Sequence, residues 1–252
     1  MNVRSDPWSD LWLLRQPWTE PPGDPLAVSE LSEVELGRAD SFRRAHDRLL
    51  YLTAHIALRR LLAAYLEIPP REVPLTRQPC PSCGGAHGRP AVAGDPPPLH
   101  YSLSHSSGLA LFGVSSAPIG VDVEKIPSQE TVELCTPALH KKEQEEIERL
   151  GALERRFAFA RLWTRKEAYL KGIGTGLARE LSADYLGATE GSGYGGPPGW
   201  MVDNVPCGSS HVNHVAAAAL SADAVRPERI GWLPADFLFA GGVTEPLDSH
   251  SR

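Results

Sequence analysis

The pattern of hydrophobic and polar positions predicts helices and strands in separate blocks along the chain. Apolar residues recur at roughly helical spacing over residues 41–66, and Pro69 and Pro70 follow, which predicts one long helix. The charged segment 141–150 and the aromatic-rich segment 155–171 predict two more helices. Each helix is long enough to cover part of a sheet.

Strand patterns fill the stretches between these helices. The turn residues Ser106-Ser107-Gly108 separate two of the strands. Pro- and Gly-rich segments at 69–98 and 187–199 are expected to be irregular. The predicted strands cover residues 11–14, 101–105, 109–114, 119–126 and 212–220.

This order of elements indicates an α+β fold. We divide it into an N-terminal half, residues 1–117, and a C-terminal half, residues 118–252, which meet near Pro118. The end of the chain after Pro234 has little periodicity, so a poorly ordered tail is expected.

Composition narrows the function classes. The net charge of −6 offers no general basic surface for nucleic acid. The sequence contains no run of about 18 apolar residues, so no membrane span is predicted. The first residues lack an apolar leader, so a cytoplasmic protein is expected. A disulfide framework is not expected from four cysteines in a chain of 252 residues.

Arginines gather in one early segment, opposed only by Asp40 and Asp47. Such a local basic face suits a small anion or an acidic partner, although a solvated helix face is the simpler interpretation. The arginines are Arg38, Arg43, Arg44, Arg48, Arg59 and Arg60.

Two carboxylates mark the strand at 119–126. Asp122 and Glu124 are two residues apart and therefore share one face, while Val121 and Val123 face the core. Paired carboxylates suit a hard cation such as Mg²⁺, which prefers oxygen ligands. From this strand alone, a solvated edge strand is the preferred explanation of the two acids.

The helix at 155–171 carries a second group. Trp163, Glu167 and Lys171 follow at intervals of four and lie along one side of the helix. A third metal carboxylate with an ammonium one turn away is the functional interpretation. A packed helix with an ordinary Glu–Lys pair is the alternative.

A third group, Ser102-Leu103-Ser104-His105-Ser106, offers hydroxyls and an imidazole. Neighbouring strand residues face opposite sides, so Ser104 and His105 are poorly placed as a hydrolytic nucleophile and base. Contact with a phosphate suits them better.

These three groups, in this order, resemble the Sfp-type 4′-phosphopantetheinyl transferases. The acid pair in Gly120-Val121-Asp122-Val123-Glu124-Lys125 and the Trp-x-x-Lys-Glu-x-x-x-Lys helix that starts at Trp163 match the family's signature. Gly88-Arg89-Pro90 resembles its Gly-Lys-Pro element with Arg in place of Lys. The resemblance covers about residues 30–220.

The resemblance implies two pseudo-symmetric α/β halves in a monomer, with a metal site where they meet. It implies that Asp122, Glu124 and Glu167 hold Mg²⁺ against the pyrophosphate of coenzyme A, and that Lys171 contacts the same phosphates. Glu167 would act as the general base. For the cofactor's 3′-phosphate the resemblance implies Ser104, His105 and Arg89. It also implies Arg38, together with either Arg43 or Arg44.

The implied reaction moves phosphopantetheine from coenzyme A to a serine of an apo acyl or peptidyl carrier protein. The partner supplies the nucleophile, so the enzyme must neutralise charge and align the groups. Secondary metabolism is one plausible setting. Two rivals stay open: a metal-dependent hydrolase of coenzyme A or a nucleotide, and a non-catalytic protein that binds carriers.

An insert departs from the family pattern. Cys80, Cys83 and His87 resemble half of a zinc site, and either Cys207 or His100 would have to supply a fourth ligand. We expect a structureless loop or a weak metal knuckle rather than a zinc site.

Overall fold

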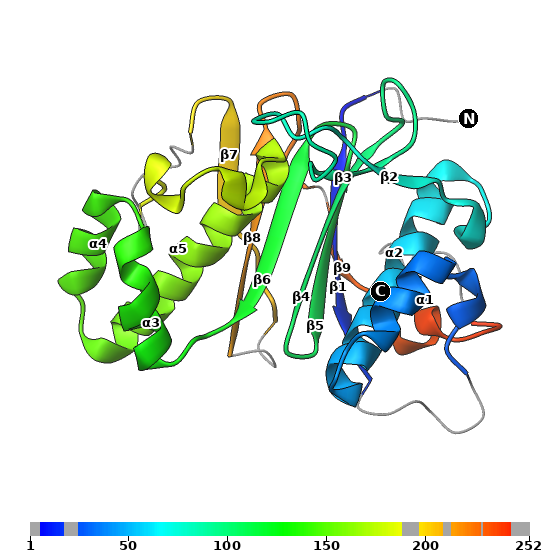
Figure 1. Ribbon diagram of the computed structural model, residues 1–252, viewed down its shortest axis with the longest axis horizontal. Helices are drawn as coiled ribbons and strands as arrows, with labels where there is room; N and C mark the ends of the chain where they lie inside the picture. The colour runs from blue at the N-terminus through cyan, green and yellow to red at the C-terminus, as the bar shows by residue number, and fades with distance from the viewer. Residues whose placement is uncertain (1–5, 18–24, 188–196, 209–212, 228, 243–252) are drawn as a thin grey trace.

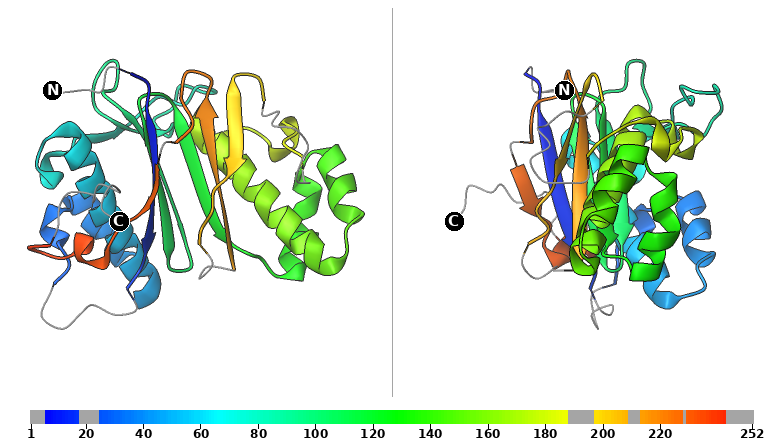
Figure 2. Two further views of the ribbon diagram at one scale, coloured as in Figure 1. Left: turned by 180° about the vertical axis from the view of Figure 1, so that it is seen from behind. Right: turned by 90° about the vertical axis from the view of Figure 1, so that its left-hand side faces the viewer.

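Two sheets, each covered by one long helix, make up the computed structural model (Figures 1 and 2). It describes residues 6–17, 25–187, 197–208, 213–227 and 229–242. The helices are α1 (Glu33–Asp40), α2 (Ala45–Leu66), α3 (Gln129–Cys135), α4 (Lys141–Glu148) and α5 (Ala152–Ile173), with 3₁₀ turns η1 (Val28–Glu30), η2 (Pro70–Glu72), η3 (Thr136–Ala138), η4 (Gly176–Ala178), η5 (Leu181–Ala183) and η7 (Ala235–Leu238).

The strands form a four-stranded sheet in the order β4-β5-β1-β9, a three-stranded sheet in the order β6-β8-β7, and a small hairpin of β2 and β3. Pairing is antiparallel except between β1 and β9. The strands are β1 (Ser9–Arg15), β2 (Leu75–Arg77), β3 (Pro90–Val92), β4 (His100–Ser106), β5 (Leu109–Ser115), β6 (Ile119–Lys125), β7 (Trp200–Asn204), β8 (His214–Ser221) and β9 (Arg229–Trp232).

The mixed α+β fold is therefore confirmed. Both halves also have the same order of strands and long helix along the chain. In the first half, the chain runs β1, α2, β4, β5, and β5 lies between β1 and β4. In the second half it runs β6, α5, β7, β8, and β8 lies between β6 and β7. Both long helices have 22 residues. The repeated topology supports the division at residue 117, which stays a prediction.

The long helix α2 is the core helix of the first half. It begins at Ala45 rather than residue 41, because a separate helix, α1, ends at Asp40. Among the described helices, α2 alone is long and apolar enough to cross a membrane, and 72% of its apolar window is buried within the fold. Packing against the four-stranded sheet accounts for its apolar character.

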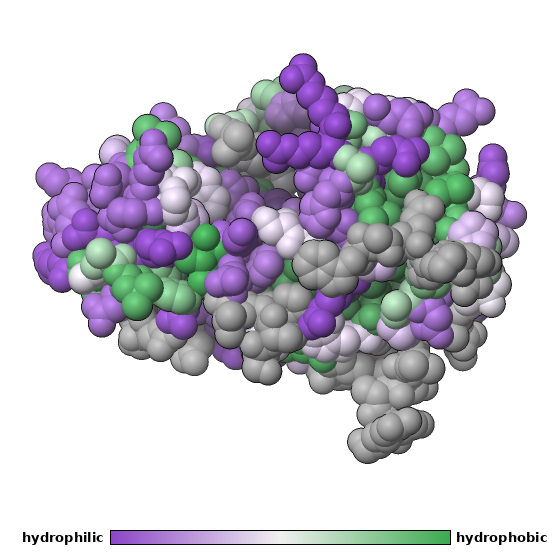
Figure 3. Space-filling view, turned by 90° about the horizontal axis from the view of Figure 1, so that it is seen from below, coloured by the Kyte–Doolittle hydropathy of each residue, from purple (hydrophilic) through white to green (hydrophobic). Residues whose placement is uncertain are grey.

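A second apolar core joins the two sheets. Leu11 and Leu111 of the first sheet pack with Val121 and Val123 of β6 and with Ala218 of β8. The side chains of these strands are almost completely buried. The outer surface over α3, α4 and α5, by contrast, is mostly hydrophilic (Figure 3, left). The shared core holds β4 and β6 beside each other, which places the candidate site between the halves.

The chain returns to the first half at its C-terminal end. Strand β9 pairs with β1, and Phe237 and Leu238 of η7 are fully buried in the first core. Residues 229–242 are thus an ordered part of the N-terminal half rather than of the C-terminal one. The rest of the predicted poorly ordered tail, residues 243–252, lies outside the described residues.

A close approach between β6 and α5 requires glycine at position 120. A Cβ atom there would lie 2.0 Å from the carbonyl oxygen of Ala168 and 2.3 Å from the nitrogen of Gly172. Both neighbours are backbone atoms, which cannot rotate away. Glycine at this position lets the helix with Glu167 and Lys171 lie directly on the strand with Asp122.

We therefore expect Gly120→Ala to lower the free energy of unfolding by about 3 kcal/mol, because the helix must move off the strand. Thermal and urea denaturation measure the loss. Gly37→Ala is the matched control: a Cβ there meets nothing within 4 Å, and alanine favours the exposed helix α1. Equal stability of the Gly120→Ala variant and the wild type would contradict the close packing.

Candidate active site

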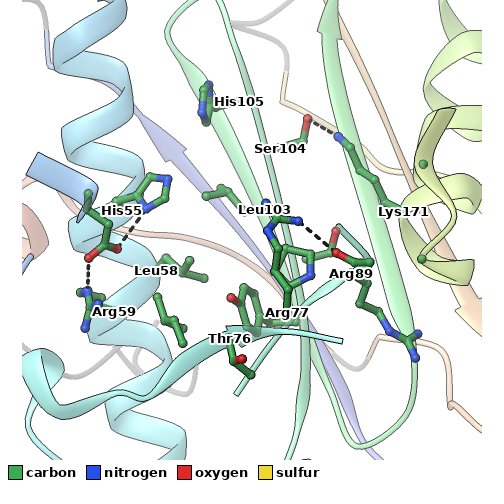
Figure 4. Close-up of a pocket in the computed structure, with 18 of the residues that line it drawn as sticks. His55, Leu58, Arg59, Thr76, Arg77, Arg89, Leu103, Ser104, His105 and Lys171 are labelled. Atoms are coloured by element: carbon green, nitrogen blue, oxygen red, sulfur yellow. Dashed lines mark hydrogen bonds and ion pairs between the residues drawn. The ribbon is translucent and has the colours of Figure 1, made fainter. Parts of the chain in front are cut away.

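A large pocket of about 1340 Å³ opens between the two halves. One wall comes from α2, η2, β2 and β3, and the other from β6 and the C-terminal end of α5 (Figure 4). Strand β4 forms the floor with Leu103, Ser104 and His105. The volume exceeds the roughly 300–1,000 Å³ of ordinary small-molecule sites. A long, branched ligand therefore has room in it.

Serines of β4 hold the adjacent strand β6. Ser102 Oγ accepts a hydrogen bond of 3.0 Å from the backbone N–H of Val121. Ser104 Oγ donates to Asp122 Oδ1 at 2.8 Å, and Ser106 Oγ donates to Glu124 Oε2 at 2.8 Å. Because strand residues alternate, all three hydroxyls face β6. The two acids are therefore held by a neighbouring strand and do not form a solvated edge.

Lys171 completes this arrangement from α5. Its Nζ atom donates to Asp122 Oδ1 at 2.6 Å. It also donates to Ser104 Oγ at 3.0 Å (Figure 4). The Lys171 side chain is 33% exposed and that of Asp122 only 2%. An ammonium group therefore reaches into the pocket beside the acid pair.

Burial disfavours charge on the other two carboxylates. It raises the pKa of Glu124 above its ordinary value, and the neighbouring charge of Asp122 adds to the shift. Burial and Asp122 likewise raise the pKa of Glu167. Two buried carboxylates whose pKa values are raised, next to the charge of Asp122, form a site that gains by binding a cation.

The donor set fits a metal ion. Asp122 Oδ2 is buried and has no hydrogen-bond partner, so one strong acceptor is left unused. Glu124 and Glu167 face the same pocket. The oxygens of these three acids do not all lie within 4.8 Å of one another. Among the described residues, only the ligand atoms of Cys80, Cys83 and His87 are grouped that closely.

The α5 sequence divides its roles between adjacent residues. Trp163, Glu167 and Lys171 all line the pocket, as their helical spacing predicts. The intervening Lys166 is buried and pairs with Glu143 Oε2 of α4 at 2.8 Å. One face of the helix thus serves the pocket and the other the core.

The structure brings three predicted phosphate contacts to the pocket: Ser104, His105 and Arg89. His105 lines it, and burial together with the nearby His55 and Lys171 lowers the pKa of His105. Arg89 lines it too, while donating to Gln78 Oε1 at 2.8 Å and to the carbonyl oxygen of Gly172 at 2.7 Å. The second bond ties Arg89 to the carbonyl end of α5, where a cation is favoured.

The early arginines are not one basic face. Arg38, Arg43 and Arg44 are exposed, and none of the three is among the described residues that line the pocket. Arg38 lies over the ring of Phe42. The remaining three each have an acidic partner: Arg48 with Asp40, Arg59 with Glu35 and Arg60 with Glu30.

Other basic groups, which the sequence patterns do not single out, line the pocket. Arg59, one of the early arginines, projects into the pocket from α2, and so does His55 (Figure 4). Arg77 of β2 and Arg71 of η2 lie on the same wall as Arg89. Their segments read as irregular or apolar, so no spacing rule identifies them. Only the folded hairpin places Arg77 near Lys171.

A buried ionic group fixes this wall. Glu35 Oε2 accepts from Arg59 Nε at 2.8 Å, and Glu35 Oε1 lies 3.2 Å from His55 Nδ1. Ser32 and Glu35 also form a capping box that starts α1, a sequence signal that predicts this helix. Burial raises the pKa of Glu35, but hydrogen bonds from His55 and Ser32 outweigh it and lower the pKa to about 2.

A lowered carboxyl pKa stabilises the folded state above the unfolded pKa of 4.5, and the contribution is lost as the pH falls towards 2. We expect the stability difference between wild type and Glu35→Gln to reach about 3 kcal/mol above pH 5 and to shrink below pH 4. Urea denaturation from pH 2 to 7 measures it. A difference that does not vary with pH would remove the charge of Glu35 from the explanation.

Comparison with known proteins agrees with this geometry. Residues 118–192, which contain the acid pair and α5, match the model of the 4′-phosphopantetheinyl transferase superfamily. The chain is 30% identical to the 4′-phosphopantetheinyl transferase HetI of Nostoc sp. over 82% of each chain. It is 27% identical to gsp of Aneurinibacillus migulanus (54% of this chain, 52% of the relative) and 23% identical to Sfp of Bacillus subtilis (62% and 66%), both 4′-phosphopantetheinyl transferases. Since the likeness to HetI spans both halves and the pocket between them, the chain belongs to the 4′-phosphopantetheinyl transferase superfamily.

Proposed function

We propose that the protein transfers the 4′-phosphopantetheine group of coenzyme A to a serine of an apo acyl or peptidyl carrier protein, releasing adenosine 3′,5′-bisphosphate. The observation that carries this proposal is the meeting of Asp122, Glu124, Glu167 and Lys171 in one pocket between the halves. Such a pocket offers groups for a pyrophosphate and its counterion.

Asp122, Glu124 and Glu167 are the proposed ligands of Mg²⁺. The unused acceptor Asp122 Oδ2 and the raised pKa values of Glu124 and Glu167 support this assignment. The ion would neutralise pyrophosphate charge, which is the main electrostatic need of phosphoryl transfer.

The basic residues of the pocket are proposed to bind the cofactor's other phosphate. His105 and Arg89 keep the role that the resemblance implies, and Arg77 joins them because it lies on the same wall. Ser104 instead positions Asp122 and Lys171, since its hydroxyl is bonded to both. Arg38, Arg43 and Arg44 would reach the cofactor only if it extends beyond the pocket.

Two side chains are proposed to move the protons. Glu167, which lines the pocket together with Lys171 and the acid pair, would accept the proton of the carrier's serine. Lys171 would contact the phosphates and protonate the leaving group. The serine oxygen then attacks the β-phosphorus of coenzyme A in line, and the bond to the bisphosphate oxygen breaks.

The carrier is proposed to meet the C-terminal half, where arginines could attract an acidic partner. Two of these arginines already donate hydrogen bonds within the chain. Arg155 donates to the carbonyl oxygens of Glu148 and Leu150, and Arg156 donates to that of Pro127. We further propose a cytoplasmic monomer that binds neither nucleic acid nor membrane and serves secondary metabolism.

Incubation with coenzyme A, Mg²⁺ and a panel of apo-carriers, followed by intact mass measurement, tests the function. The expected result is a carrier that gains the mass of one phosphopantetheine group and a matching amount of adenosine 3′,5′-bisphosphate. Cleavage of coenzyme A with no gain in carrier mass would indicate the hydrolase. Carrier binding without either product would indicate the non-catalytic alternative.

A further inference from the structure

The loop between β2 and β3 brings three metal-binding side chains together. One ligand atom from each of Cys80, Cys83 and His87 lies within 4.8 Å of the other two. The closest approach, between Cys83 Sγ and His87 Nε2, is 3.0 Å. The loop is therefore organised around these side chains, which disagrees with a structureless loop and leaves the other expectation, a metal knuckle, open.

The backbone of the loop turns towards the sulfur atoms. The N–H of Cys80 donates to the carbonyl oxygen of Gly85 at 2.7 Å, and the N–H of Gly84 donates to that of Cys80 at 2.8 Å. The N–H of Gly85 donates to Cys83 Sγ at 3.4 Å. Donors of this kind stabilise thiolates, the form in which cysteine binds a metal.

Two glycines make the turn possible. Gly84 has a φ of +71°, which a residue with a Cβ rarely adopts. A Cβ on Gly85 would lie 3.0 Å from the ring of His87 and 3.3 Å from Cys83 Sγ. A larger residue at position 85 would therefore crowd the three ligands.

We propose that Cys80, Cys83 and His87 bind one Zn²⁺ ion at the rim of the pocket. Zn–S bonds of about 2.3 Å and Zn–N bonds of about 2.0 Å in a tetrahedron separate sulfur and nitrogen by roughly 3.5 Å. Cys83 Sγ and His87 Nε2, which are 3.0 Å apart, need to part by only about half an ångström to admit the ion. Soft sulfur ligands with imidazole favour zinc over the hard cation of the carboxylate site.

Water takes the fourth position. Cys207 is buried in the core between the sheets and donates to the carbonyl oxygen of Val205. His100 does not join the group, nor does any other His, Cys, Asp or Glu of the described chain. The two residues that the sequence offers as fourth ligands are thus not used.

The ion would stabilise the hairpin that carries Arg77 and Arg89. His87, Gly88 and Arg89 line the pocket in succession, and Gly88 packs so closely that a Cβ would lie 2.3 Å from the carbonyl oxygen of Gln78. Of the three ligands only Cys80 is buried, so the loop has little apolar core of its own. A metal would supply the cross-link that packing does not, and so act on Arg89 through the loop.

Metal analysis of tag-free wild type and of the double variant Cys80→Ser/Cys83→Ser tests the site. We expect about one zinc per wild-type chain and less than a tenth in the double variant. Cys135→Ser, in α3 and outside the group, is the matched control and should keep its zinc. Cobalt-loaded wild type should show thiolate-to-cobalt absorption, a readout that does not depend on whether any variant folds.

The positioning role rests on the proposed function and has its own readout. Loss of zinc should raise KM for coenzyme A about tenfold and change kcat less, because Arg89 moves while Glu167 and Lys171 do not. Any of three results would overturn the zinc site. They are wild-type protein that binds no zinc when zinc is added back, cobalt-loaded protein without thiolate absorption, and a disulfide between Cys80 and Cys83 in freshly purified protein. Zinc binding by a protein that transfers no phosphopantetheine would leave the site in place and reject only the proposed function.

Discussion

Replacing Glu167 by Gln lowers kcat for phosphopantetheine transfer by about 10²–10⁴-fold while the melting temperature stays within a few degrees. The amide is nearly isosteric with the carboxylate but cannot accept the serine proton, and it is a weaker ligand for Mg²⁺. Removal of a carboxylate whose pKa is raised by burial and by Asp122 also relieves repulsion in the pocket, so the fold should not suffer. Initial rates with saturating coenzyme A and carrier measure the effect.

The control for this variant lies on the same helix. Glu154→Gln, in the exposed first turn of α5, makes the same change of charge away from the pocket and should transfer at the wild-type rate. Circular dichroism and thermal denaturation report on the fold of both variants. Full activity of Glu167→Gln would remove this residue from both proton transfer and metal binding.

Replacing the adjacent Lys166 by Met lowers the free energy of unfolding by about 3–5 kcal/mol. The Lys166 ammonium donates to Glu143 Oε2 at 2.8 Å and to the carbonyl oxygens of Leu181 and Asp184 at 2.8 and 2.5 Å. Its side chain is 3% exposed and that of Glu143 is 0% exposed. Methionine leaves a buried carboxylate without its counterion. Urea denaturation with activity measured on the folded fraction checks the result.

Two further variants sharpen this prediction. Lys141→Met, at the exposed start of α4, should change stability by less than about 0.5 kcal/mol. The double variant Lys166→Met/Glu143→Met removes both charges and should recover much of the loss, since neither partner stays buried alone. A loss below about 1 kcal/mol in Lys166→Met would mean that the pair is relaxed by water.

Periodicity was sufficient for the parts of the fold in which local pattern and packing agree. Strand β6 and helix α5 have the predicted bounds to within a few residues, because alternation in one and helical spacing in the other define their buried faces. Strand β9 was not expected, because it pairs with β1, the first strand of the chain. The β2–β3 hairpin and β7 were not expected either, because β2 and β3 have only three residues each and the residues of β7 do not alternate between apolar and polar. Helix α1 was missed although its capping box is visible in the sequence.

The site was predictable where one element sets the geometry. The stripe of Trp163, Glu167 and Lys171 needs only a regular helix, and all three line the pocket. The arginines needed tertiary structure, because their charge alone does not say whether a salt bridge, the solvent or a ligand receives it. Thus Arg59 and Arg60 are buried in ion pairs, while Arg77 reaches the pocket from a segment expected to be irregular.

The return of the chain to its first half has a consequence for biosynthesis on the ribosome. Arg60 is 2% exposed and donates to the carbonyl oxygens of Phe237 and Phe239 at 3.0 and 3.1 Å, as well as to Glu30. During translation these two acceptors emerge long after α2, so α2 waits with a buried cation only partly satisfied. The nascent N-terminal half is thus incomplete until residue 239 has been synthesised, and a premature stop before residue 237 would leave it exposed to proteases.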